Sequence, residues 1–210
     1  EIEKILEVPD NDILNKLNPI YDLIKITSKD KILEGKDLIG FVGGTWTLLV
    51  YMLNKQSPKN LNDNIFLYSN KKQLIQKIIN TQKLHIKKQV DSGASVIQIF
   101  DSWAGLLNND RLEEYIYKPT LEIMEYTRSL GIRTICFPRC IKNYKQYCDI
   151  IKPNAISIDY EVDPKTIAEN IDIPIQGGMD PKCLLLDKNE MLNRAKEYLE
   201  IFKNHKYIFN

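Results

Sequence analysis

Polar and aromatic side chains stand directly after a short apolar run near the middle of the chain. The run, VIQIF at 96–100, is too brief for a helix, and its β-branched residues favour a strand that is buried on both faces. Asp101, Ser102 and Trp103 follow it, and an Ala-Gly pair at 104–105 gives the backbone room to turn. Parallel strands that deliver such side chains at their carboxyl ends build the active sites of α/β barrels and doubly wound sheets. We therefore expect the functional site here.

Four other predicted strands also end in polar or glycine-rich residues. These ends are Gly43 and Gly44, Pro138 and Arg139, Asp159 and Tyr160, and Gln176 to Gly178. In a parallel sheet they converge on one rim, where charge and place make Arg139 a candidate partner for a carboxylate. None of the ends contains a His-Glu-x-x-His motif, a nucleotide-binding glycine loop or a Ser-His-Asp set. The strand ends thus lack the motifs of zinc, nucleotide and serine-nucleophile sites, and Arg139 is kept as a candidate partner for a carboxylate.

Apolar strands and amphipathic helices alternate along the chain. Strands are predicted at 38–42, 96–100, 134–137, 155–158, 173–175 and 207–209, with the first one buried. Helices are predicted at 1–30, 45–52, 71–91, 112–130, 143–150, from 163 and at 190–202. Asp163 and Asp180, each followed by proline, are interpreted as helix caps, and 54–64 as a surface loop. This alternation predicts a parallel α/β sheet with right-handed crossovers.

Six strand units are two short of a TIM (β/α)8 barrel, which takes about 250 residues. An open doubly wound sheet is the alternative, but its G-x-G-x-x-G loop after the first strand is absent. The chain opens on Glu1 rather than methionine and closes on KYIFN, a strand without its following helix. We therefore expect residues 1–210 to be a single domain, a partial TIM barrel from a longer polypeptide that lacks segments at both ends.

Composition limits the classes of partner. The 29 basic and 28 acidic residues give a net charge of +1, so there is no overall basic surface for nucleic acid. There is no signal-like segment and no run of 18 apolar residues that would span a membrane. The four cysteines, at 136, 140, 148 and 183, are interpreted as reduced thiols of a cytoplasmic protein, and C-x3-C at 136–140 is not a metal-binding spacing.

Four segments resemble, in order and spacing, the motifs of the uroporphyrinogen decarboxylase family. They are LIGFVGGTWTLLVYM at 38–52, IFDSWAG at 99–105, SIDYEVDP at 157–164 and IQGGMDP at 175–181. The resemblance implies a cytoplasmic TIM-barrel carboxy-lyase of haem biosynthesis, usually a homodimer without cofactor. Such an enzyme removes CO2 from the four acetate side chains of uroporphyrinogen III to give coproporphyrinogen III. Protonation of the pyrrole makes the ring its own electron sink, so the protein must bind a polyanion and supply protons.

The resemblance also implies roles for particular residues. Tyr51 and Ser102 match the family's tyrosine and small hydroxyl residue, which hydrogen-bond substrate carboxylates, and Gly43 and Gly44 let the backbone approach a large flat ligand. Thr45 stands where the family usually has proline. The family's pyrrole-binding aspartate and arginine segment fall upstream of this sequence, and its histidine falls downstream. We therefore expect no catalytic residue within residues 1–210 and no decarboxylation by this segment alone.

Other interpretations remain open. A zinc- and corrinoid-dependent methyltransferase of the same superfamily would need a His-x-Cys set that the sequence lacks, and a catalytically silent tetrapyrrole-binding barrel would need no catalytic residue. At single positions, Tyr51 would be interpreted as a core aromatic residue if the family resemblance were left aside, and Ser102 could be a helix cap. Asp101 is interpreted as a residue that orders the turn, and His85 and His205 as surface residues.

Overall fold

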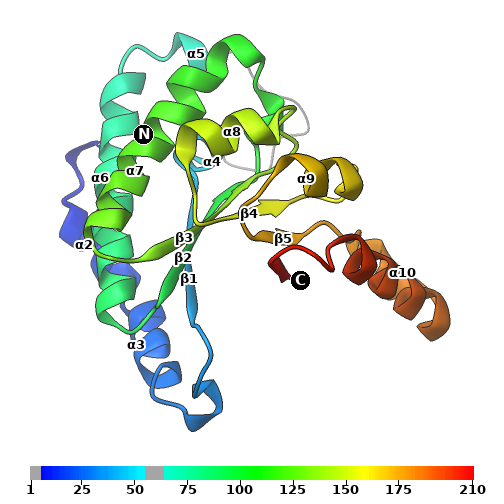
Figure 1. The fold of residues 1–210 in the computed structure, drawn as a ribbon. Coiled ribbons are helices and arrows are strands. Elements are labelled where there is room, and N and C mark those ends of the chain that lie inside the picture. Colours follow the sequence, from blue (N-terminus) through cyan, green and yellow to red (C-terminus); the bar gives the residue numbers. More distant parts are fainter. Residues whose placement is uncertain (1–5, 55–63) are drawn as a thin grey trace.

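The computed structural model describes residues 6–54 and 64–210, and its centre is a parallel sheet of six strands (Figure 1). The strands are β1 (Ile39–Gly43), β2 (Val96–Asp101), β3 (Arg133–Pro138), β4 (Ala155–Ile158), β5 (Ile175–Gly177) and β6 (Tyr207–Ile208). Every neighbouring pair is parallel, and the order in the sheet is the order in the chain. The predicted α/β alternation is therefore confirmed. Strands added one after another in the same direction are the winding of a barrel, whereas a doubly wound sheet reverses direction at a switch point.

Helices connect the strands. They are α2 (Asp10–Lys16), α3 (Asn18–Thr27), α4 (Thr45–Asn54), α5 (Asn64–Leu67), α6 (Lys71–Asp91), α7 (Lys118–Ser129), α8 (Tyr144–Ile151), α9 (Pro164–Asn170) and α10 (Lys188–Ile201). A π-helical turn, Glu113–Tyr117, precedes α7, and a 3-10 helix, Pro181–Leu185, follows β5. Within the described residues, none of the helices is both long and apolar enough to cross a membrane.

The prediction of one continuous helix over 1–30 is wrong for the described part of that range. The helix ends at Lys16 and a second begins at Asn18, with Leu17 as the residue between them. Pro19 lies in the first turn of α3, where its missing N–H is tolerated. In an unbroken helix its ring would clash with the carbonyl of Asn15, so the helix must restart here.

The remaining boundaries mostly agree with the sequence predictions. Asp163 caps α9 through the backbone N–H groups of Lys165 and Thr166, and Asp180 caps the following 3-10 helix, as interpreted. β5 begins at Ile175, two residues after the predicted start, and runs to Gly177. The predicted loop at 54–64 falls almost entirely outside the described residues, since only its ends, in α4 and α5, are described.

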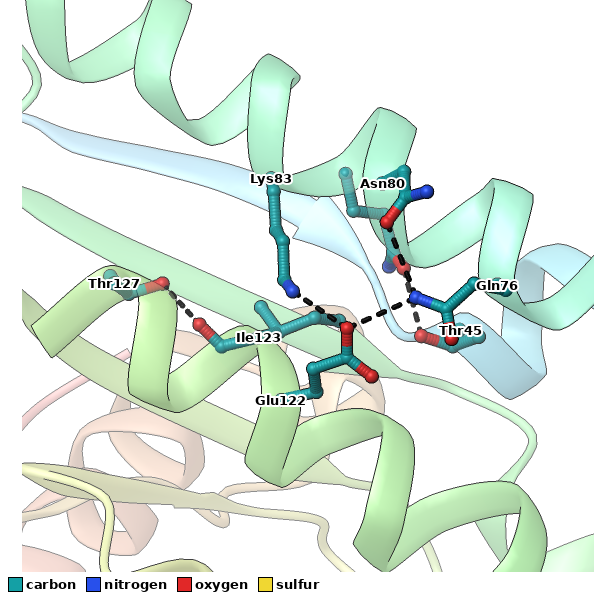
Figure 2. A network of polar contacts seen from close by, with 8 residues as sticks. Thr45, Gln76, Asn80, Lys83, Glu122, Ile123 and Thr127 are labelled. Atoms are coloured by element: carbon teal, nitrogen blue, oxygen red, sulfur yellow. Dashed lines mark hydrogen bonds and ion pairs between the residues drawn. The ribbon is translucent and has the colours of Figure 1, made fainter. Parts of the chain in front are cut away.

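The core lies between the outer face of the sheet and the helices. Ile97, Ile99 and Cys136 are buried in this layer, while Val96 and Ile135 belong to a smaller cluster on the inner face. Figure 2 shows how α6 is fastened to α7 at the surface, where Lys83 Nζ lies 2.7 Å and Gln76 Nε2 3.1 Å from Oε1 of Glu122. Every residue of β2 except the half-buried Phe100 is buried, so β2 is covered on both faces, as predicted.

The first strand differs from its prediction. Phe41 is 64% exposed and Ile39 38% exposed, so the expectation of a buried strand is wrong for the inner face of β1. In the described residues β1 pairs only with β2, and its other edge carries no strand. Gln89 of α6 occupies that edge: its Nε2 donates to the carbonyl of Phe41 and its Oε1 accepts from the Phe41 N–H, each at 3.0 Å. A side-chain amide therefore satisfies the backbone groups that a strand would pair.

Candidate functional site

A cavity of about 760 Å³ opens at the carboxyl ends of the strands. Its polar lining includes Gln98, Ser102, Arg139, Ser157 and Asp159, which come from β2, β3, β4 and the segments that follow them. Phe100 and Phe137 supply apolar walls, and their rings meet edge to face with centroids 5.9 Å apart. The predicted convergence of distant strand ends on one rim is therefore present, and the cavity combines flat apolar surfaces with groups that bind anions.

Arg139 is held by its backbone. Its N–H donates to the carbonyl of Asp101 at 3.1 Å, and its own carbonyl accepts from the N–H of Gly105 at 3.0 Å. The next residue, Cys140, has φ of +59°, in the left-handed region that is strained for a residue with a side chain. Asp159 stabilises this turn, because its Oδ2 accepts from the Cys140 N–H at 2.7 Å. These contacts fix the backbone of Arg139 at the edge of the cavity.

Asp159 is a buried carboxylate with several donors. Besides Cys140, it accepts from the hydroxyl of Tyr144 at 2.7 Å and from the backbone N–H of Glu161 at 2.8 Å. Burial, together with the charge of Asp159, raises the pKa of Tyr144, so this tyrosine stays protonated as a donor. Although Asp159 borders the cavity, its oxygens are occupied in holding the turn beneath Arg139.

Tyr51 and Ser102 lie on neighbouring segments. The Tyr51 ring, on α4, meets the ring of Trp103 edge on, with centroids 6.1 Å apart, and is 40% exposed. Ser102, the residue before Trp103, lines the cavity, whereas Tyr51 is not among the residues that form its wall. The structure thus brings the two hydroxyl residues to the same region, and their contacts with substrate stay predictions.

The two glycines after β1 have different surroundings. Gly43 borders a second, largely apolar cavity of about 320 Å³ between β1, α2, α4 and α6, and its carbonyl accepts from Gln82 Nε2 at 2.6 Å. Gly44 packs against Asp101, where a Cβ would lie only 2.6 Å from the carboxylate carbon. A side chain at 44 would therefore displace Asp101. Contact of either glycine with a ligand stays a prediction.

Asp101 does not line the cavity. It is 3% exposed, and its Oδ1 accepts from the hydroxyl of Thr47 at 2.7 Å. Burial raises the pKa of Asp101 to about 7, against the partial opposing effect of the Thr47 hydrogen bonds. The interpretation that Asp101 orders the turn agrees with this geometry, since the residue connects the end of β2 to the first turn of α4.

Two features were not identified from the sequence. Gln98, inside the apolar run, lines the cavity and donates from Nε2 to Oε1 of Gln176 at 2.9 Å, with both side chains buried. The available signal was its position, because it alternates with the outward-facing Ile97 and Ile99 and so points to the inner face.

The interpretation of His85 as a surface residue is wrong: its ring hydrogen-bonds Tyr21 at 2.8 Å and Gln89 at 3.0 Å, and burial lowers its pKa.

Metal ligands do not gather in the described part of the chain, where no three His, Cys, Asp or Glu side chains lie close enough together to hold an ion. The four cysteines are free thiols. Cys136 is buried in the sheet, and burial raises its pKa to about 12, so it is a neutral thiol at physiological pH. The polar groups that line the cavity are hydroxyl, amide, carboxylate and guanidinium groups.

Comparison with known proteins gives a consistent result. The whole chain, residues 1–210, matches the family model described as Uroporphyrinogen decarboxylase (URO-D). A uroporphyrinogen decarboxylase from Wolbachia pipientis wMel is 36% identical over 214 residues, covering 100% of this chain and 63% of that protein. One from Campylobacter jejuni strain RM1221 is 34% identical over 220 residues, again covering 100% of this chain and 63% of the relative. The chain thus spans less than two thirds of the length of these relatives.

A solved structure is also similar. A methyltransferase from Methanosarcina mazei superposes with a TM-score of 0.68 at 16% sequence identity, covering 92% of this chain and 58% of that one. At this identity the likeness concerns the fold alone. It agrees with the barrel-type winding of the six strands.

Proposed function

The chain belongs to the uroporphyrinogen decarboxylase family, and we propose that it forms the main part of the substrate-binding barrel of a carboxy-lyase. The substrate is uroporphyrinogen III, whose four acetate side chains lose CO2 to give coproporphyrinogen III. A cytoplasmic homodimer without cofactor is part of this proposal, as the family resemblance implies. The side chains that line the cavity at the strand ends support the part of the proposal that concerns the substrate.

The observation that carries the proposal is Arg139 beside Ser102 in the cavity. Among the residues that line it, Arg139 is the only lysine or arginine in the described part of the chain. A guanidinium presents paired N–H groups that match a carboxylate, and partial burial strengthens the pair. Uroporphyrinogen offers carboxylates on a flat apolar ring system, which suits a cavity with the aromatic walls of Phe100 and Phe137.

The reaction needs little covalent participation by the protein. Protonation of a pyrrole carbon next to the acetate arm creates a cationic ring; the bond to CO2 then breaks, and its electron pair returns to the ring. A proton added to the exocyclic carbon makes it a methyl group. The ring carbon then releases the proton that it took up in the first step, which restores the aromatic pyrrole, so that each CO2 is replaced by one proton. In our proposal Arg139, Ser102 and Tyr51 bind acetate and propionate carboxylates and hold the ring in place, so that proton delivery takes place on an oriented substrate.

We place the pyrrole-binding carboxylate outside these 210 residues. The chain spans 63% of the length of the uroporphyrinogen decarboxylase from Wolbachia pipientis wMel. The family resemblance implies that the group that holds the pyrrole N–H groups lies upstream of this sequence. We therefore expect no decarboxylation by residues 1–210 alone. Turnover of uroporphyrinogen by the purified segment would overturn this part of the proposal.

The test compares Arg139→Ala and Arg139→Lys in the full-length protein that carries this sequence, with porphyrin products separated by chromatography. Loss of a charge-assisted hydrogen bond to a carboxylate costs about 1.5–3 kcal/mol, so we expect KM to rise about 10- to 100-fold in Arg139→Ala. Lysine restores part of the affinity through its charge. Arg194→Ala, which removes an exposed arginine paired with Glu197 on α10, is the control and leaves KM unchanged. An unchanged KM in Arg139→Ala would reject the assignment.

The same preparation separates the other candidate functions. Stoichiometric zinc together with methyl transfer to a thiol would identify a methyltransferase. Binding of uroporphyrin without turnover by the full-length protein would identify a catalytically silent barrel. Accumulation of coproporphyrinogen distinguishes the decarboxylase from both.

A further inference from the structure

α4 begins directly after Gly44, which has no side chain with which to cap it. The first turn of a helix leaves backbone N–H groups unpaired, and a nearby carboxylate stabilises it through hydrogen bonds and the helix dipole. Asp101 supplies such a carboxylate from the end of β2, since its Oδ1 accepts from the hydroxyl of Thr47, in the first turn of α4, at 2.7 Å. The cap is therefore provided by a strand 54 residues further along the chain.

The Thr47 hydroxyl has a second partner. While donating to Asp101 at 2.7 Å, it accepts from the backbone N–H of Trp103 at 3.3 Å. Trp46 strengthens the same junction, because its Nε1 donates to the Trp103 carbonyl at 2.9 Å. Asp101 and Thr47 are both at least 95% buried, at 3% and 4% exposure, so water does not compete for these bonds.

Tyr51 lies one helical turn beyond Thr47. Residues four apart share a face of a helix, so the face of α4 that Thr47 fastens to residues 101–103 is also the face that carries Tyr51. The ring of Tyr51 contacts that of Trp103, the residue after Ser102. A shift of the first turn of α4 would therefore move Tyr51 relative to Ser102.

We infer that Asp101 is a positioning residue, which acts through Thr47 to set the place of Tyr51 relative to Ser102. This inference deepens the proposed function and rests on it only for the effect on substrate. The carboxylate does not reach the cavity, so Asp101 touches no reacting atom. Gly44 is needed for the same contact, because only a residue without a Cβ lets the Asp101 carboxylate approach the first turn of α4.

The experiment uses the full-length protein with 5-fluorotryptophan, in which the 19F signal of Trp103 is assigned by its loss in Trp103→Phe. Thr47→Val removes the hydroxyl at constant volume, and Thr47→Ser keeps it. Thr127→Val is the matched control, because Thr127 is also buried in a helix and its hydroxyl donates to the carbonyl of Ile123 within the same helix (Figure 2). Asp101→Asn, which keeps the shape and one acceptor oxygen, is a second route to the same result if Thr47→Val fails to fold.

We expect Thr47→Val to shift the Trp103 signal and to raise KM for uroporphyrinogen about tenfold while kcat changes by less than about twofold. Thr47→Ser keeps the Trp103 signal and KM at their wild-type values, and so does Thr127→Val. Asp101→Asn shifts the Trp103 signal and KM in the same direction as Thr47→Val, but by less. A general loss of folded protein would instead lower apparent kcat at constant KM. That pattern, or an unchanged Trp103 signal in Thr47→Val, would overturn the inference. If the wild-type protein shows no decarboxylation, the proposed function fails, while the Trp103 signal still decides the positioning role.

Discussion

Gln98 on β2 and Gln176 on β5 hydrogen-bond each other at 2.9 Å although β3 and β4 stand between their strands in the sheet. Such a contact is possible only if the sheet curls so that its inner face becomes concave. Both amides are buried, at 5% exposure, and Gln98 also borders the cavity. The curvature that brings them together is the same curvature that makes the strand ends converge on one site.

The first prediction concerns this pair. Gln98→Leu or Gln176→Leu leaves one buried amide without its partner, which should lower the free energy of unfolding by about 1–3 kcal/mol. The double variant should lose less than the sum, because it leaves no orphaned amide. Urea unfolding monitored by circular dichroism measures all three. Gln73→Leu, at an exposed position on α6, is the control. Additive losses in the double variant would contradict the coupling.

Adjacent glycines should respond differently to the same substitution. In Gly44→Ala the new Cβ would lie 2.6 Å from the Asp101 carboxylate carbon, within a buried group that cannot move freely. In Gly43→Ala it would lie 3.0 Å from the end of the Leu48 side chain, which can rotate away. We expect Gly44→Ala to lower the free energy of unfolding by about 1–3 kcal/mol and Gly43→Ala by less than half as much. Equal losses would show that Asp101 imposes no requirement on Gly44.

The edge of β1 yields a third prediction. Gln89→Leu removes the amide that pairs with the N–H and carbonyl of Phe41, and leucine offers neither donor nor acceptor. The Phe41 N–H should then exchange with solvent at least about tenfold faster, as expected for the loss of one protecting hydrogen bond. Amide hydrogen exchange followed by NMR measures the rate. The N–H of Leu74 is the control: Leu74 lies on α6, as Gln89 does, and its N–H donates to the Asn70 carbonyl, so its exchange rate should not change.

Much of the fold could be predicted from the sequence because the relevant signals are local. Apolar runs of strand length alternate with helical periodicity, and this alone requires a parallel sheet whose carboxyl ends meet. Ser102 and Arg139 were expected on one rim for that reason and lie there. The exposure of Phe41 was not predictable, because an apolar run does not reveal which strand lies at the edge of the sheet.

The precise geometry of the site depends on long-range relationships that no local pattern encodes. The hydrogen bond between Gln98 and Gln176 depends on the curvature of the whole sheet. The hydrogen bond between Thr47 of α4 and Asp101 joins two segments that are 54 residues apart in the sequence. The turn after Arg139 depends on the left-handed conformation of Cys140, a residue type that gives no sign of positive φ. Such contacts become visible only when the strands are in register.

The last prediction concerns pH and the buried carboxyl of Asp101. Its pKa rises from the ordinary 3.8 to about 7 in the folded state through burial. Between these pH values the carboxyl is protonated in the folded protein and ionised in the unfolded chain. The contribution of Asp101 to the free energy of unfolding therefore falls as pH rises from about 4 to 7 and is constant above that range. The total decrease is roughly 4 kcal/mol. The neighbouring Cys136 and Tyr147 stay neutral in this window, because burial raises the pKa of each.

Asp101→Asn removes this dependence, so its free energy of unfolding relative to wild type should increase steadily between pH 4.5 and 7. Urea unfolding at several pH values measures the difference. Asp163→Asn is the control of opposite sign: the hydrogen bonds to Thr166 lower the pKa of Asp163, so its contribution is lost only as pH falls below the ordinary range. Its difference from wild type should therefore stay constant over the same window. A constant difference for Asp101→Asn as well would mean that Asp101 is already ionised in the folded protein at pH 4.5.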